Sequence, residues 1–204
     1  MRVRYFVVVG LVFFLIGCGR TQPELLIDSF EGDLNEETVD FGASDGSSLT
    51  IAAEKDLKID GAQSLKVVYD LKPSGYMWVA RGFNLDVKGA DRWLVKPDGI
   101  KWRNYDSFNF DLHGDPDGGM IAVDIKDAGG EVWRFLIDGK FEGWKAIACP
   151  FKLFFARDDW QPQSAEKNGV MDFPIMSFQF EPRLPGQGVY YFDGVNLSRL
   201  AAKK

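Results

Sequence analysis

The sequence has few of the residues that metal sites and catalytic centres need. Its 204 residues include one histidine and two cysteines. A histidine cluster or a set of cysteines at zinc-ligand spacing is therefore excluded, and two cysteines cannot build a disulfide framework. Cys149 lies between Ala148 and Pro150 in an apolar stretch, which is typical of a small buried core residue.

The sequence also lacks an excess of basic residues. It holds 24 Lys and Arg against 30 Asp and Glu, which gives a formal net charge of −6. Nucleic-acid binding depends on dense Lys and Arg patches that release counterions, and the sequence contains no such run. Nucleic acid is therefore not expected as a partner.

The longest uncharged apolar run, residues 5–16, follows Arg2 and Arg4. It is well short of the roughly 20 residues that a helix needs to cross a bilayer, and its layout is that of a signal peptide. The run ends in Leu15-Ile16-Gly17-Cys18, which resembles the bacterial lipobox, where the cysteine receives a diacylglycerol before cleavage on its N-terminal side. We expect residues 1–17 to be a lipoprotein signal peptide and Cys18 to be lipidated. The alternative is a plain secretory peptide that contains a cysteine by chance.

The expected anchor places the domain near its membrane. Residues 18–24 form only a short tether before a single domain at 25–200. Gly19, rather than Asp, follows Cys18, so the resemblance implies a cell-envelope protein anchored in the outer membrane if the host has one. Removal of residues 1–17 takes two arginines away and makes the formal charge −8.

The rest of the sequence reads as short β-segments separated by Gly, Asp, Asn and Pro. In the segment 107–113, Phe108, Phe110 and Leu112 alternate with polar residues, as in a half-buried strand. No segment after the signal peptide keeps the 3.6-residue period of a helix. The expected strands are 64–71, 76–87, 107–113, 120–126, 131–137, 144–150, 175–181 and 189–197.

Many short strands with no helices to cover them predict an all-β fold, an antiparallel two-sheet β-sandwich. Glycines in the segments 115–119 and 127–130 supply the positive φ angles that tight connections between such strands require. Residues 88–101 and 155–172 are expected to be longer loops, where function often lies.

A series of short motifs runs along nearly the whole domain. In order they are Ile27-Asp28-Ser29-Phe30-Glu31-Gly32, Gly61-Ala62-Gln63-Ser64-Leu65-Lys66-Val67, Trp102-Arg103-Asn104-Tyr105-Asp106-Ser107-Phe108, Gly143-Trp144-Lys145, Pro150-Phe151 and Tyr190-Tyr191-Phe192-Asp193-Gly194-Val195. This series resembles the carbohydrate-binding modules of the galactose-binding-like superfamily, most closely family 11, and also the domain of complex I intermediate-associated protein 30. The resemblance implies a jelly-roll sandwich without catalytic activity.

The resemblance also implies a structural calcium ion that joins the first strand to the last. The residues that match its carboxylate ligands are Asp28, Glu31 and Asp193. Calcium takes six or more oxygen ligands, so backbone carbonyls would complete the site. The alternative is that Asp28 and Asp193 only end their strands.

A sugar site is implied on the concave face of one sheet. Aromatic rings stack on the apolar faces of sugars, and planar polar groups bracket the hydroxyls. Tyr76 and Trp78 are the candidate platforms. The candidate polar groups are Asp111, His113, Asp124, Arg134, Gln179 and Glu181. Alternatively, some of these residues only satisfy one another on a solvated sheet.

The other tryptophans divide into two groups. Trp102 and Trp144 match structural positions of the resembling family, and Trp133 lies on an apolar strand face, so all three are expected to pack. Trp93 and Trp160 lie in the two long loops, where an aromatic side chain favours contact with a ligand or partner. The alternative for Trp160 is a turn with a hydrophobic plug.

The sequence contains no convincing catalytic motif. The segment 42–46 fits G-x-S-x-G by letter, but no helical pattern follows it, and the one histidine, His113, belongs to an alternating strand. No enzyme is therefore expected. The sequence favours a membrane-anchored module that binds a glycan or polysaccharide. The alternative is an envelope assembly factor that uses the same sandwich to bind a protein.

Overall fold

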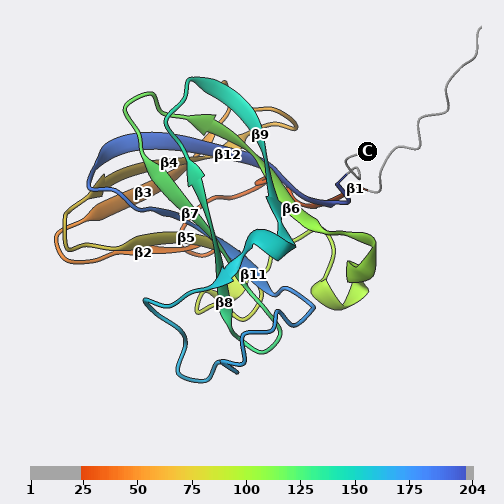
Figure 1. The fold of residues 1–204 in the computed structure, drawn as a ribbon. Helices are drawn as coiled ribbons and strands as arrows, with labels where there is room; N and C mark the ends of the chain where they lie inside the picture. The colour runs from red at the N-terminus through yellow and green to blue at the C-terminus, as the bar shows by residue number, and fades with distance from the viewer. Residues whose placement is uncertain (1–23, 201–204) are drawn as a thin grey trace, which may run out of the picture.

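The computed structural model describes residues 24–200, which form two antiparallel six-stranded sheets (Figure 1). The expected signal peptide, Cys18 and most of the tether lie outside these residues. Sheet A contains, in spatial order, β3 (Ser48–Glu54), β4 (Ser64–Leu71), β12 (Gly186–Ser198), β6 (Ser107–Gly114) and β9 (Gly143–Pro150), with β1 (Glu24–Asp28) paired to β12. Sheet B contains β10 (Phe155–Ala156), β8 (Val132–Asp138), β7 (Met120–Lys126), β11 (Ser177–Pro182), β5 (Met77–Gly82) and β2 (Asp40–Ala43). The predicted all-β two-sheet sandwich is confirmed.

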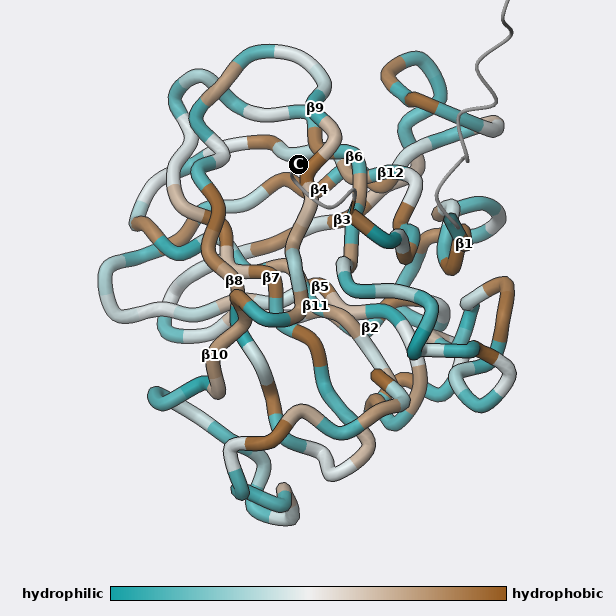
Figure 2. Tube along the Cα trace, turned by 45° about the vertical axis from the view of Figure 1, so that its right-hand side comes forward, coloured by the Kyte–Doolittle hydropathy of each residue, from teal (hydrophilic) through white to brown (hydrophobic). Residues whose placement is uncertain are grey.

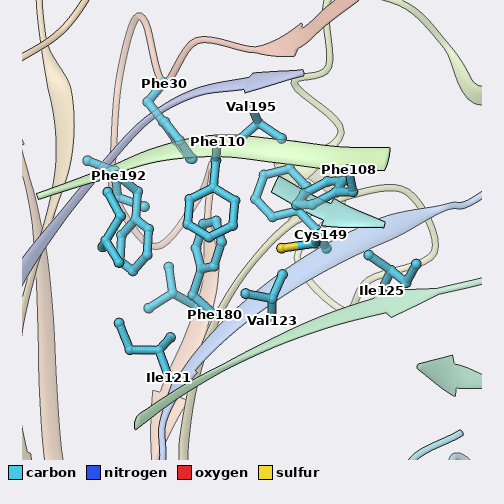
Figure 3. Packing of buried hydrophobic residues seen from close by; sticks show 14 of the residues in the cluster. Phe30, Phe108, Phe110, Ile121, Val123, Ile125, Cys149, Phe180, Phe192 and Val195 are labelled. Atoms are coloured by element: carbon cyan, nitrogen blue, oxygen red, sulfur yellow. The ribbon is translucent and has the colours of Figure 1, made fainter. Parts of the chain in front are cut away.

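The space between the sheets is filled by inward-facing side chains of both. Phe180 of β11 stacks on Phe192 of β12 with ring centroids 4.0 Å apart, and Phe110 of β6 lies 4.8 Å from Phe180 (Figure 3). Cys149 is fully buried in the same cluster, and burial raises the pKa of its thiol. The cysteine is therefore a neutral core side chain, as the sequence predicts.

Hydrophobic and hydrophilic residues alternate along many of the strands (Figure 2), which explains why most strands could be predicted. The predicted bounds of 64–71 and 120–126 are those of β4 and β7. The segment 76–87 is too long, because the chain turns at Gly82, where φ is +125° and any Cβ would lie 2.6 Å from the Met176 carbonyl. The short strands β1, β2 and β10, and the edge strand β3, were not among the predicted strands.

The connections between strands contain four single 3₁₀ turns: η1 (Lys88–Ala90), η2 (Pro97–Gly99), η3 (Trp102–Asn104) and η4 (Phe151–Leu153). Within residues 24–200 no helix has the length and apolarity to cross a membrane.

The loop 88–101 folds back onto the sandwich. Leu94 donates a backbone hydrogen bond to the carbonyl of Ile27, at 2.7 Å. This contact brings Trp93 over the core, where it stacks on Phe178 at 6.0 Å and is only 6% exposed. The expectation that Trp93 contacts a ligand is therefore wrong. Trp133 is buried as predicted, and its Nε1 donates to Asp127.

Candidate ligand-binding face

The outer face of sheet B, called here the binding face, gathers six of the eight predicted ligand-binding residues. On β5 and β11, Val79 and Phe180 are paired and point into the core, so the next pair, Ala80 and Gln179, points outward. The six residues on or beside this face are Tyr76, Trp78, Asp124, Arg134, Gln179 and Glu181.

Two aromatic rings form a platform at the β2–β5 edge of this face. Trp78 Nε1 donates a hydrogen bond of 2.9 Å to Asp40 Oδ1. The indole lies directly over Gly42, where a Cβ would come within 2.5 Å of its ring. Tyr76 stacks on Trp78 at 5.9 Å with 20° between the ring planes, and it is 51% exposed. Asp40 and Gly42 thus hold the Trp78 ring in place on the sheet, and the Tyr76 ring of the platform is exposed to solvent.

The centre of the face is held by Arg134, whose side chain is 5% exposed. Its Nε and Nη2 donate to the two oxygens of Asp124, at 2.7 and 2.8 Å, and Nη2 also donates to Glu181. Burial alone would lower the pKa of Arg134, but its hydrogen bonds and charge attraction to Asp124, with the charge of Glu181, raise it above its ordinary value. Burial raises the pKa of Glu181 despite the attraction of Arg134. These side chains are fixed before any ligand arrives.

Arg157 and Arg183, which were not predicted as site residues, also belong to this network. Arg157 donates to Asp124 at 3.1 Å and to Asp159 at 2.6 Å, and Arg183 donates to Glu181 at 2.8 Å. Burial would raise the pKa of Asp159, but the hydrogen bond and charge of Arg157, with further arginine charges, hold it below its usual range. Three arginines therefore balance three carboxylates on this face.

The loop 155–172 adds the second aromatic group. Trp160 is 55% exposed, and the guanidinium of Arg157 lies 5.4 Å from the centre of its ring. A shallow hollow lies between this ring and the middle of the sheet. Its lining includes Leu85, Lys126, Asp124 and Gln179 beside Trp160. The expectation that Trp160 is an exposed loop aromatic is confirmed.

Asp111 and His113 do not join the other six residues. Both lie on β6 in sheet A, where His113 contacts Trp144 and Tyr191 with ring centroids 5.5 Å apart. Alternation identified the polar side of this strand, but it could not tell to which sheet the strand belongs. The eight predicted residues therefore do not form a single site, because Asp111 and His113 lie on the other sheet.

The three carboxylates predicted to bind calcium are engaged by protein donors. Asp28 accepts two hydrogen bonds from the buried Arg81, at 3.0 and 3.1 Å, and burial raises its pKa against the attraction of that arginine. Asp193 accepts the backbone N–H groups of Ile59 and Asp60, and Glu31 accepts that of Ala62. Among residues 24–200 no group of three His, Cys, Asp or Glu side chains is arranged to hold a metal ion. The predicted three-carboxylate calcium site does not fit this arrangement.

Chelation tests this conclusion. Because Arg81 supplies positive charge to Asp28 and backbone amides satisfy the other two carboxylates, we expect the melting temperature to be the same in EDTA and in excess calcium. Differential scanning calorimetry would measure it. A clear rise with calcium would show that the folded domain binds the ion and would contradict this conclusion.

A β-sandwich that carries aromatic rings and pre-arranged polar groups on one sheet has the features of a carbohydrate-binding module. The model of the carbohydrate binding domain (family 11) matches residues 19–200, and the chain belongs to this family. The family 11 domain is itself non-catalytic. No curated protein matches the chain.

Solved structures of similar proteins share the fold. The family 11 module of a cellulosomal cellulase of Clostridium thermocellum has a TM-score of 0.63 and 20% identity, over 87% of this chain and 95% of its own. A module from the same organism in complex with a β-1,3-1,4-mixed-linked tetrasaccharide has a TM-score of 0.63 and 21% identity, over 86% and 95%. An exo-β-agarase has a TM-score of 0.56 and 14% identity, over 87% of this chain and 26% of the enzyme.

Proposed function

We propose that this protein is a lipid-anchored envelope protein that holds a neutral polysaccharide on the outer face of sheet B. The observation that carries the proposal is the placement of Trp78 and Trp160, with Gln179 and the Arg134–Asp124 pair on the same face. Rings of this kind can stack on sugar units, and the polar groups between them can bracket hydroxyls.

The charge of the face favours a neutral sugar. Each arginine of the network is paired with a carboxylate, so none remains to recognise an acidic sugar. Asp40 and Asp86 add negative charge near Lys126. The similar module that was solved with a mixed-linked β-1,3-1,4 tetrasaccharide supports a β-glucan as the first ligand to test.

The second part of the proposal is the lipid anchor at Cys18. The segment Leu15-Ile16-Gly17-Cys18 resembles a lipobox, and Gly19 is compatible with an outer-membrane location. Lipid chains on Cys18 would hold the module at the envelope and bring polysaccharide to the cell surface.

Affinity electrophoresis tests the proposed ligand. Migration of the protein is expected to be retarded in gels that contain mixed-linked or β-1,4-glucan, and not in gels that contain a polyuronic acid. A protein that all glycans leave unretarded, and that recovers one protein partner in a pull-down from envelope extracts, would favour the assembly-factor alternative.

Replacing Gly42 by Ala tests the role of the Trp78 platform. The added Cβ would lie 2.5 Å from the indole, so the ring must shift, and we expect the shift to disturb its hydrogen bond to Asp40. We expect weaker glucan binding and a shift in tryptophan emission. Gly99→Ala is the matched control, because its Cβ would make only an ordinary contact of 3.6 Å with Val95. Unchanged affinity with shifted emission would show that the ring does not contact the ligand.

A further inference from the structure

The start of the domain and the end of its last strand lie together at one end of the sandwich. Glu24, at the start of β1, pairs with Ser198 at the end of β12. The carbonyl of Ser198 accepts the N–H of Asp106, and the carbonyl of Asp106 accepts the N–H of Phe151. In Figure 1, η3 and the final residues of β12 lie on the same side of the molecule as β1. We call this region the anchor end and define it as residue 24 with residues 101–106, 150–154 and 198–200, and Phe173.

The anchor end exposes large apolar side chains. Trp102 packs against Phe151 and Phe173, with ring centroids 6.4 and 5.3 Å apart. On the outside of this cluster Phe173 is 44% exposed, Leu153 is 56% exposed and Leu200 is 38% exposed. These side chains form a rim around the end of the sandwich and do not extend its core.

The same segments carry exposed basic side chains. The exposed basic residues are Lys101, Arg103, Lys152 and Arg199. No ion pair in the described part of the chain uses any of them. The acidic residues of the anchor end are Glu24 and Asp106, so basic groups outnumber acidic ones here, although the chain as a whole is acidic.

The tether limits the distance between this end and a lipidated Cys18. Five residues separate Cys18 from Glu24. A fully extended chain spans about 3.6 Å per residue, so Glu24 lies at most about 22 Å from the anchored cysteine. The end that exposes apolar and basic side chains is therefore held within about 22 Å of the anchored cysteine.

We infer that the anchor end docks on the headgroup region of the bilayer that holds Cys18. Lys101, Arg103 and Lys152 contact anionic headgroups, and Leu153 and Phe173 enter the interface. The inference rests on the proposed lipidation.

Hydrogen exchange tests the docking with the mature lipidated protein in nanodiscs. We expect exchange over 101–106 and 150–154 to be slower by about fivefold or more in nanodiscs of phosphatidylethanolamine and phosphatidylglycerol than in phosphatidylcholine, the size expected from even one basic contact. Combined Lys101→Glu, Arg103→Glu and Lys152→Glu substitutions should remove this protection.

The control is a charge reversal at the opposite end of the sandwich. Lys72 lies beside the start of β12, and Lys140 and Lys145 lie near the start of β9, far along the strands from the anchor end. Lys72→Glu, Lys140→Glu and Lys145→Glu change the same number of charges and should leave the protection intact. Equal exchange in the two lipids, or loss of protection with the control set, would overturn the docking. If mass spectrometry finds no diacylglycerol on the protein and the protein dissociates from the nanodisc, both the docking and the lipid anchor are overturned. Glucan binding measured in the same sample tests the binding face alone.

Discussion

Replacing Asp28 by Asn is expected to lower the free energy of unfolding by about 3–5 kcal/mol, because it leaves the charge of Arg81 buried without its partner. Both side chains are 1% exposed. Arg81 Nε and Nη2 donate to the two oxygens of Asp28, Nη1 donates to the carbonyl of Thr38, and the guanidinium lies 5.7 Å from the ring of Phe30. The pair joins β1 of one sheet to β5 of the other.

Urea denaturation monitored by circular dichroism measures this effect. The matched control is Asp70→Asn, which removes a carboxylate from an exposed pair with Lys72 and should change stability little. The double variant Asp28→Leu with Arg81→Met removes both charges and should be more stable than Asp28→Asn alone. If Asp28→Asn had the stability of the control, Arg81 would have another partner or access to water.

Replacing Trp160 by Ala is expected to raise the dissociation constant for β-glucan about thirtyfold, the effect of losing roughly 2 kcal/mol at a central aromatic contact. The ring is 55% exposed and rests on Arg157, so the sandwich should keep its melting temperature. Isothermal titration calorimetry with a mixed-linked tetrasaccharide provides the constant.

Trp144→Ala is the control for this variant, because it removes the same residue type from β9, in the other sheet. It should leave glucan affinity unchanged. Equal losses for the two variants would mean that the ligand does not lie on the binding face, whereas a loss for Trp144→Ala alone would move the site to the face that holds His113.

The strands were largely predictable because the side-chain period of a strand is visible in the sequence. In β6 and β7 the inward residues, such as Phe110 and Val123, alternate with polar ones, so both strands were found almost to the residue. Alternation fails for β2, which has four residues, and for β10, which has two.

The binding face could be predicted only in part, since its composition depends on the pairing of strands distant in sequence. Gln179 and Asp124 are adjacent because β11 pairs with β7, which no local pattern reveals. Arg157 reaches Asp124 because Ala156 pairs with Trp133. Equally, His113 has the alternation of a binding-face residue, but its strand belongs to sheet A.

The loops were the least predictable part. Trp93 and Trp160 are both aromatic residues in long polar segments, and the sequence treats them alike. A single backbone hydrogen bond from Leu94 to Ile27 brings the first loop onto the core, while Trp160 remains exposed beside Arg157. The difference lies in tertiary contacts that neither segment encodes by itself.

The most direct test of the proposed function is a calorimetric titration of the intact wild-type protein with a β-1,3-1,4-mixed-linked tetrasaccharide. Saturable binding at one site per chain, abolished or strongly weakened by Trp160→Ala, is the expected result. A folded protein that gives no heat of binding with this or any other neutral glucan oligosaccharide would contradict glycan binding on the face of sheet B.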